Sequence, residues 1–193
     1  MTCRNRKPKK NINVEEFSPR TVIRERRREL RYKKEIRSFF LRTVILLVSI
    51  WILFGMFFGI TVMKNDDMSP RISAGDLLFY YRLENRFSAG DVVVFQKSGK
   101  EYVGRIVAKG GDKVEITNRS ELKVNDGVVL EDDIYYSTPQ YDSDVTYPLI
   151  LSEEEYFILC DYREQAEDSR YFGAVAGEAI KGKVLAVIRR SEL

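Results

Sequence analysis

Residues 67–76 read DMSPRISAGD, and this stretch divides the chain into two parts with different sequence patterns. An uninterrupted apolar run, residues 43–63, ends just before it, and almost every segment that resembles a β-strand comes after it. Within the stretch a carboxylate, Asp67, and a hydroxyl, Ser69, lie two positions apart. What the protein does therefore depends on whether this stretch still carries out chemistry or only maintains a fold.

Charge is distributed unevenly along the chain. Residues 1–42 carry 15 Lys and Arg against 5 Asp and Glu, whereas the remainder carries 17 against 24. Residues 1–19 are basic and polar without an apolar period, so we expect them to be disordered. Residues 21–37 are rich in helix formers, and we expect a basic helix that either lies against anionic headgroups or is simply solvated.

The apolar run at residues 43–63, TVILLVSIWILFGMFFGITVM, predicts a transmembrane helix. It contains 21 residues without a charge, and at about 1.5 Å per residue it spans a hydrocarbon core of about 30 Å. It is longer than the apolar core of a signal peptide, and no small-x-small cleavage site follows it. Positive charge precedes the run, so we expect residues 1–42 in the cytoplasm, an uncleaved single-pass anchor at 43–63, and residues 64–193 outside the cell membrane.

Composition excludes several chemistries. The chain has no histidine, which rules out a Ser-His-Asp or Cys-His mechanism and histidine metal sites. The two cysteines, Cys3 and Cys160, fall on opposite sides of the predicted membrane span, so we do not expect a disulfide between them. The folded part must then gain its stability from core burial.

The part after the membrane span has the pattern of an all-β domain. Short runs rich in β-branched and aromatic residues are separated by Gly, Asn and Ser, at residues 77–81, 91–95, 102–108, 113–117, 156–160 and 183–190. Residues 121–131 predict a hairpin, because Asn-Asp-Gly at its centre suits a tight turn. Residues 132–150, acidic and rich in tyrosine, are interpreted as an exposed excursion. The class predicted is mainly β, with a coiled sheet or barrel.

Four blocks, in this order, resemble the type I signal peptidases. They are DMSPRISAGD at 67–76, GDVVVF at 90–95, YVGRIVAKGGD at 102–112, and CDYR followed by DSRYFG within 160–173. The corresponding family patterns include Ser-Met-x-Pro, Tyr-Val-Lys-Arg and Asp-Ser-Arg. Four blocks in the same order are specific evidence for this family, whereas a single Gly-Asp pair would not be. The resemblance covers nearly all of residues 43–190 and implies the signal peptidase fold, with no cofactor, metal ion or nucleic-acid partner.

The resemblance also implies that the catalytic dyad of the family is degenerate in this chain. In the family a serine attacks the peptide, and a desolvated lysine accepts its proton. The chain has Asp67 at the serine position and Gly104 at the lysine position, and Ala166 replaces the serine that orients the lysine. The flanking motif residues remain, among them Met68, Pro70, Arg105, Asp161, Asp168, Ser169 and Arg170.

Neighbouring residues offer two alternatives for chemistry. In an extended segment Ser69 would share a face with Asp67, but it would need Lys109, which we place on the opposite face of its strand. An aspartic-type pair of Asp67 with Asp66 or Asp168 would need two carboxylates that share a proton. Asp168 belongs to a block that we interpret as structural, paired with Arg170 or Arg105. The remaining reading of Asp67 is a solvated carboxylate near the membrane.

Within the family, the chain is most similar to the non-catalytic, SipA-type signal peptidase-like proteins that are encoded with pilus genes in Gram-positive bacteria. This similarity implies an assembly factor or chaperone that helps a dedicated sortase to polymerise pilin subunits, so pilins and the sortase are the expected partners. We expect a binding cleft at Asp67, Met68, Ser69, Pro70, Gly104 and Arg105, widened where Gly104 replaces lysine. The alternatives are a peptidase with a relocated catalytic site and a purely structural surface anchor.

Overall fold

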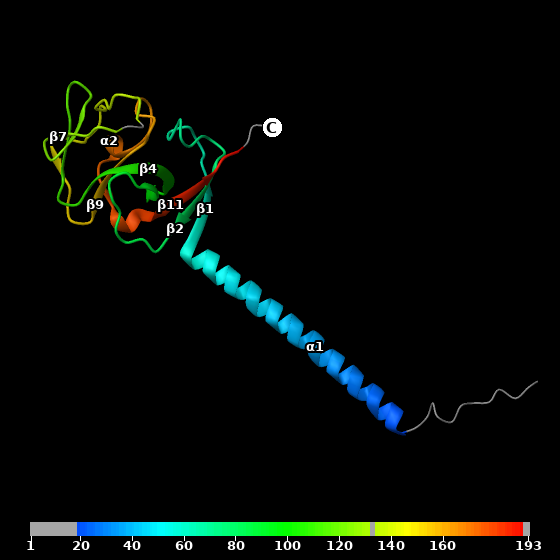
Figure 1. Ribbon diagram of the computed structural model, residues 1–193. Coiled ribbons are helices and arrows are strands. Elements are labelled where there is room, and N and C mark those ends of the chain that lie inside the picture. Colours follow the sequence, from blue (N-terminus) through cyan, green and yellow to red (C-terminus); the bar gives the residue numbers. More distant parts are fainter. Residues whose placement is uncertain (1–18, 132–133, 191–193) are drawn as a thin grey trace, which may run out of the picture. The chain divides into compact units, whose positions relative to one another are not determined.

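The computed structural model describes residues 19–131 and 134–190 (Figure 1). Of residues 1–19, the segment expected to be disordered, all but the last lie outside the described residues. Cys3 is among those outside. Contacts divide the chain into two units, Met1–Trp51 and Ile52–Leu193, and each is described by itself.

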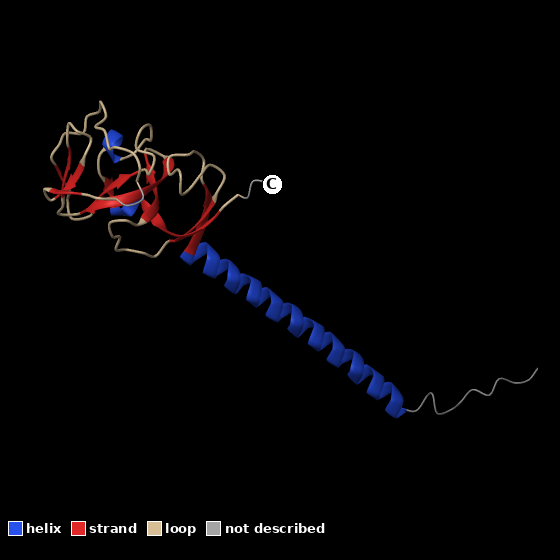
Figure 2. Ribbon diagram, turned by 45° about the horizontal axis from the view of Figure 1, so that its top comes forward, coloured by secondary structure: helices blue, strands red, loops and turns tan. Residues whose placement is uncertain are grey.

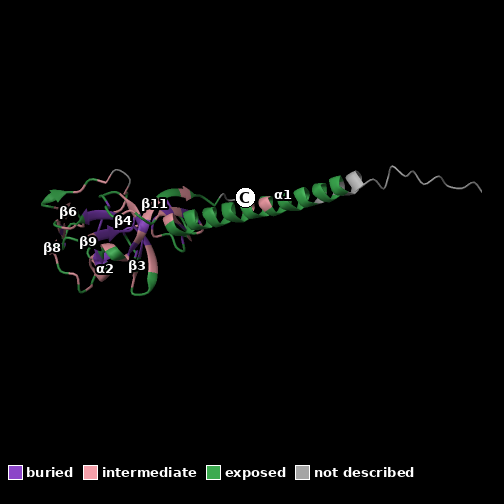
Figure 3. Cartoon of the chain, turned by 90° about the horizontal axis from the view of Figure 1, so that it is seen from below, coloured by how far each residue is buried: buried purple, intermediate pink, exposed green. Residues whose placement is uncertain are grey.

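In its described part, from residue 19 onward, the first unit is a single long helix. α1 runs over Pro19–Ile52, so the basic segment and the first half of the apolar run belong to one continuous helix. Its apolar side chains are largely exposed within the chain (Figure 3). By length and composition, Arg26–Phe57 could cross a membrane, which agrees with the expected anchor.

The end of the apolar run differs from the prediction of one helix over residues 43–63. After α1 comes a short π-helical segment, η2 (Leu53–Phe57), and then a strand, β1 (Phe58–Val62), which pairs with β2 (Leu77–Tyr81). The β-branched residues of β1 favour a strand, and Gly59 lets the strand approach its neighbour, because a Cβ there would lie 2.2 Å from the Tyr80 ring. Hydropathy alone could not separate this strand from the helix.

The second unit consists of two antiparallel sheets (Figure 2). The larger has the order β1-β2-β11-β3-β4-β9-β10, and the smaller has the order β7-β6-β5-β8. The strands not yet given are β3 (Val92–Lys97), β4 (Lys100–Lys109), β5 (Lys113–Ile116), β6 (Leu122–Val124), β7 (Gly127–Val128), β8 (Leu149–Ile150), β9 (Glu155–Leu159), β10 (Val175–Ala176) and β11 (Ile180–Ile188). The mainly-β class is confirmed, but both sheets are open, and the described residues form no closed barrel.

The predicted hairpin is confirmed at the tip of the smaller sheet. β6 and β7 pair around Asn125 and Asp126, whose φ angles are 52° and 68°. These residue types tolerate the left-handed region at low cost, which is why the turn could be predicted. Two helical turns, α2 (Ser169–Phe172) and η3 (Gly177–Ala179), connect the last strands of the larger sheet.

The excursion at residues 132–150 is packed rather than simply exposed, as far as residues 134–150 are described. Thr138 is buried, and the Tyr141 hydroxyl donates to the carbonyl of Arg163 at 3.1 Å. Arg163 itself is fully buried and donates to Thr138 and to the Glu131 carboxylate. A buried guanidinium needs such partners, so polar residues of the excursion are drawn inward.

The core that supports the candidate site lies between the larger sheet and the loop after β1. It contains Met63, Met68, Ile72, Leu78, Tyr80, Val94, Val103, Cys160 and Ala166, all buried. Two further apolar clusters fill the rest of the unit. Strand β4 contributes to all three clusters, and β9 contributes to the two further ones.

Candidate functional site

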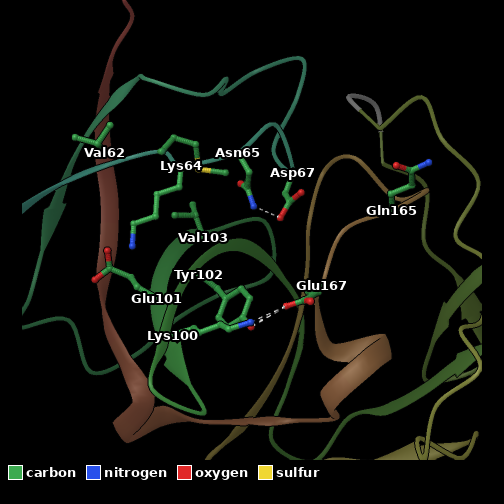
Figure 4. A pocket seen from close by; sticks show the side chains of 11 residues that line it. Val62, Lys64, Asn65, Asp67, Lys100, Glu101, Tyr102, Val103, Gln165 and Glu167 are labelled. Carbon is green, nitrogen blue, oxygen red and sulfur yellow. Dashed lines mark hydrogen bonds and ion pairs between the residues drawn. The ribbon is translucent and has the colours of Figure 1, made fainter.

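A cavity of about 390 Å³ surrounds Asp67 (Figure 4). Three segments converge on it: the end of β1 with the residues after it, the first half of β4, and the loop before α2. The lining residues are Val62, Met63, Lys64, Asn65, Asp67, Lys100, Glu101, Tyr102, Val103, Gln165 and Glu167. Below, this cavity is called the Asp67 pocket. Of the six residues expected to form the cleft, only Asp67 lines it.

Asp67 is half-buried at one side of the Asp67 pocket. Its carboxylate accepts a hydrogen bond from Asn65 Nδ2 at 2.5 Å. Desolvation raises the pKa of Asp67, and the nearby carboxylates of Asp168 and Glu167 raise it further, although the Asn65 hydrogen bond acts in the opposite direction. The carboxylate therefore has a polar partner and is not the fully solvated group considered from the sequence.

The segment after Asp67 is a turn, and this corrects the expectation that Ser69 shares a face with Asp67. The Ser69 N–H donates to the carbonyl of Asp66, and the Ile72 N–H donates to the carbonyl of Met68, so the side chains do not alternate as in a strand. Met68 is fully buried, and its Sδ accepts the N–H of Asp161 at 3.4 Å. Met68, Ser69 and Pro70 therefore lie outside the Asp67 pocket.

Gly104 lies in β4 with no space beside it, which corrects the expected widening of the cleft. A Cβ at this position would lie 2.6 Å from Ile158 Cγ2, 3.2 Å from the carbonyl oxygen of Leu159 and 3.5 Å from Phe95 Cε1. Ile158 belongs to β9, the neighbouring strand. The volume that a longer side chain would take is filled by this β-branched residue.

Polar side chains from β4 and from the loop before α2 close the other side of the Asp67 pocket. The Tyr102 hydroxyl donates to Glu167 at 2.9 Å, and Lys100 Nζ lies 4.0 Å from the same carboxylate. Burial and the bond to Glu167 raise the pKa of Tyr102 to about 12. Ala166, next to Glu167, is buried in the core and contributes no polar atom.

The chemistry available in the Asp67 pocket follows from its lining. None of the described residues that line it is a serine, threonine or cysteine. Its ammonium groups, on Lys64 and Lys100, are exposed, whereas a lysine base must be desolvated to be neutral. Lys109, the other lysine considered, is exposed at the end of β4 and does not line the pocket.

Arg105 and Asp161 form an ion pair that supports the site. Arg105 donates through Nε to Asp161 Oδ1 at 2.8 Å and through a terminal nitrogen to Oδ2 at 2.5 Å, while its other terminal nitrogen reaches the carbonyl of Gly90. A bidentate pair of this kind fixes the orientation of the guanidinium plane relative to the carboxylate plane. It joins β4, the end of β9 and the turn before β3. The Arg105 side chain therefore points toward Asp161 and does not line the Asp67 pocket.

Asp168, Ser169 and Arg170 form a second buried polar cluster. Asp168 caps α2 through the N–H of Arg170 and accepts both Nε and a terminal nitrogen of its guanidinium. It also accepts the N–H of Cys160, and Ser169 Oγ accepts the N–H of Ile158. With its oxygens bound in this way, Asp168 is not arranged to share a proton with Asp67.

Sequence reasoning missed several residues of the pocket, above all Tyr102, Glu167, Lys100 and Asn65. Alternation along residues 100–103 could have placed Tyr102 on one face, but it could not show that Glu167 meets it from a distant loop. Among the described residues, no group of three or more His, Cys, Asp or Glu could hold a metal ion.

The sequence matches the family described as signal peptidase, peptidase S26, over residues 36–189. The inactive signal peptidase IA of Staphylococcus aureus strain Mu50 is 25% identical over 135 residues, which cover 64% of this chain and 74% of that protein. Signal peptidase IB of Staphylococcus aureus strain COL is 26% identical over 170 residues, covering 79% of this chain and 88% of that protein.

A crystal structure of a signal peptidase I from Enterococcus faecalis V583 is similar with a TM-score of 0.45 and 26% identity, and covers 52% of this chain and 97% of that one. The family match spans most of the chain, including the Asp67 pocket and both polar clusters that support it. The chain therefore belongs to the signal peptidase family, peptidase S26.

Proposed function

We propose that this protein is a membrane-anchored, catalytically inactive signal peptidase homologue that acts as an assembly factor or chaperone in sortase-dependent polymerisation of pilin subunits. Its N-terminus would lie in the cytoplasm and residues 64–193 outside the cell membrane. The pilin role rests on the sequence resemblance, and the relatives named inactive signal peptidase IA support the loss of catalysis.

The observation that supports the inactivity is the lack of space for a side chain at Gly104. The sequence resemblance implies that the family's lysine base stands at this position, but a Cβ there would lie 2.6 Å from Ile158 Cγ2. At the position of the nucleophile, Asp67 presents a carboxylate whose neighbours Glu167 and Asp168 are also acidic. With the dyad positions that the resemblance implies, the proposal is that the pocket offers neither the family's serine hydroxyl nor its neutral lysine amine.

A pocket without a nucleophile can still hold an extended peptide. β1 is an edge strand of the larger sheet, and its end forms one wall of the Asp67 pocket, so its backbone can pair with a guest strand. Polar side chains on the other wall can bind the guest's backbone or side chains. In this proposal the pocket holds a segment of the pilin.

The first test is proteolysis. The purified full-length protein in detergent is incubated with a signal-peptide substrate and, separately, with a serine-directed acylating inhibitor. We expect neither cleavage nor covalent labelling. Cleavage that is lost in Asp67→Ala or Ser69→Ala would instead establish a peptidase with a relocated site.

The second test concerns the pocket and uses a matched pair of substitutions. Gln165→Trp fills the Asp67 pocket, whereas Asn118→Trp places the same ring on an exposed turn of the smaller sheet. In cells that assemble pili with this protein, we expect shortened pilus polymer ladders and a weaker pilin pull-down for Gln165→Trp alone. Normal ladders at normal membrane levels of that variant would exclude the pocket as the pilin site.

A further inference from the structure

The first half of α1 carries a short apolar line within its basic segment. Ile23 and Leu30 are 54% and 64% exposed, and they are seven residues apart in the helix. Seven residues make almost two full turns, so the two side chains lie only about 20° apart around the helix axis. One heptad is the spacing at which a helix presents apolar residues to another helix. Below, Ile23 and Leu30 are called the apolar line.

Basic residues flank the apolar line on both sides. Arg27 and Lys34 lie about 40° around the helix to one side of it. Arg26 and Lys33 lie about 60° to the other side, and all four side chains are exposed. Residues 23–37 contain eight Lys and Arg and three Glu, so five positive charges remain even if every glutamate is paired. The face around the apolar line therefore favours an anionic occupant.

The continuity of α1 decides how far the apolar line lies from the membrane (Figure 1). The candidate span, Arg26–Phe57, is 32 residues long, whereas a hydrocarbon core of about 30 Å takes about 20 residues. Counted back from Phe57, the core begins near Ser38. At about 1.5 Å per residue, Leu30 then lies about 12 Å and Ile23 about 22 Å beyond the core. The headgroup region is only about 5–8 Å deep on each side, so lipid does not reach the apolar line while α1 continues straight out of the membrane.

Two other occupants do not match this face of α1. A second copy of the chain would bring Arg26 and Lys33 of both helices together, and like charges repel at such a contact. Nucleic acid would satisfy the arginines, but it presents phosphates to a basic helix and would leave the apolar line uncovered. An amphipathic helix with acidic residues beside its own apolar residues matches both the charge and the apolar line.

We propose that residues 23–37 bind an acidic amphipathic helix of a protein partner in the cytoplasm. The partner's apolar residues cover the apolar line, and its carboxylates pair with the basic residues on both sides, as opposite charges do across a coiled coil. This inference rests on the cytoplasmic N-terminus in the proposed function, but not on the pilin role. Binding holds the membrane anchor next to a protein on the inner side of the membrane.

Photocrosslinking in the cells that make the protein tests the proposal. A benzophenone amino acid replaces Leu30 in one full-length variant, and it replaces Tyr32, about 160° away around α1, in the matched control. The crosslinked products are digested and sequenced by mass spectrometry. We expect a protein product from position 30 alone, whose crosslinked segment has acidic residues beside apolar ones at heptad spacing. A segment without this pattern, products that contain only RNA or lipid, equal products from both positions, or no product would overturn the proposal.

A titration of the full-length protein in phosphatidylcholine nanodiscs measures what the face recognises. The probe is a labelled peptide of three heptads with leucine at its apolar positions and glutamate beside them. A scrambled peptide of the same composition and a single-stranded RNA of the same charge are the comparison probes. We expect the heptad peptide to bind about tenfold more tightly than either, because only it buries the apolar line. Equal binding of either comparison probe would show that charge alone attracts anions, and loss of peptide binding in phosphatidylglycerol nanodiscs would show that lipid covers the face; both results overturn the proposal.

Single substitutions locate the peptide on α1. Leu30→Gln should weaken peptide binding about tenfold, since it removes one of the two apolar contacts. Arg27→Gln should weaken it about twofold to threefold. The matched control, Arg28→Gln, removes the same charge about 150° away from the apolar line and should leave binding unchanged. Unchanged binding in Leu30→Gln, with helicity verified by far-ultraviolet circular dichroism, or equal loss in Arg28→Gln, would overturn the assignment.

Labelling of Cys3 distinguishes failure of this proposal from failure of the proposed topology. A membrane-impermeant maleimide should label Cys3 only after cells are lysed, and Cys160, the other cysteine, is buried. Labelling of Cys3 in intact cells would place the N-terminus outside and would overturn both. The expected labelling without a crosslinked protein partner would overturn this proposal alone, and the pilin role is measured separately by pilus ladders.

Discussion

The close packing around Gly104 can be tested by adding one methyl group. In Gly104→Ala the new Cβ would lie 2.6 Å from Ile158 Cγ2 and 3.2 Å from the carbonyl oxygen of Leu159. Cγ2 is held by the β-branch and cannot swing away freely. Ile158→Leu removes this methyl group at nearly constant volume, so it should relieve the clash. The two substitutions together therefore form a thermodynamic cycle.

The expected change in the free energy of unfolding of Gly104→Ala follows from two opposing effects. Overpacking a buried site costs about 1–3 kcal/mol, while replacing glycine reduces the entropy of the unfolded chain and returns about 0.4–1 kcal/mol. We expect Gly104→Ala to lower the free energy of unfolding by about 1–2 kcal/mol. In the Ile158→Leu background the same substitution should be close to neutral, which gives a coupling energy of about 1–2 kcal/mol.

The assay is thermal and urea unfolding of the full-length protein in detergent, followed by near-ultraviolet circular dichroism of its tyrosines. A loss of 1 kcal/mol corresponds to about 3 °C in Tm for a unit of this size. Gly127→Ala is the matched control, because a Cβ there would only approach the Val124 carbonyl at 3.5 Å. Wild-type stability of the Gly104→Ala single variant, or no coupling to Ile158→Leu, would refute the packing argument.

Three further outcomes are expected. Asp67→Ser with Gly104→Lys should not cleave a signal-peptide substrate, because the new lysine has no space; efficient cleavage would contradict this. Asp168→Ala should cost about 3–5 kcal/mol in urea unfolding, since it leaves Arg170 buried without its carboxylate, whereas exposed Asp144→Ala should be neutral. Because the pKa of Asp67 is raised above its ordinary 3.8, its carboxyl favours folding when protonated, and this stabilisation is lost as pH rises through the folded-state pKa. Asp67→Asn should thus gain stability at neutral pH and lose the advantage below about pH 4; a constant difference would disprove the shift.

Much of the fold was accessible from the sequence, because short-range physics sets it. Runs of β-branched and aromatic residues identified most strands of both sheets, and Asn125 and Asp126 marked the hairpin between β6 and β7. Hydropathy identified the apolar helix but not its end. Residues 58–62 belong to the same apolar run as the helix before them, so hydropathy did not set them apart, and their pairing with β2 places them in the sheet.

The candidate site shows where sequence reasoning stops. Asp67, Gly104 and Ala166 were identified from their positions in the motifs, since a motif fixes which residue type stands at each position. Whether Gly104 leaves a hollow was predicted wrongly, because the answer depends on Ile158, a residue more than fifty positions away. Ser69 was placed by assuming an extended chain, which a turn replaces.

What the sequence determined by itself was most of the elements and which residue types stand at the motif positions, Asp67 and Gly104 among them. Only the tertiary structure decided that Ile158 fills the space beside Gly104 and that Tyr102 meets Glu167 across the Asp67 pocket. Spacing along the chain specifies local geometry. Side-chain neighbours from distant strands are set by sheet register and packing, which come into existence only when the whole unit folds.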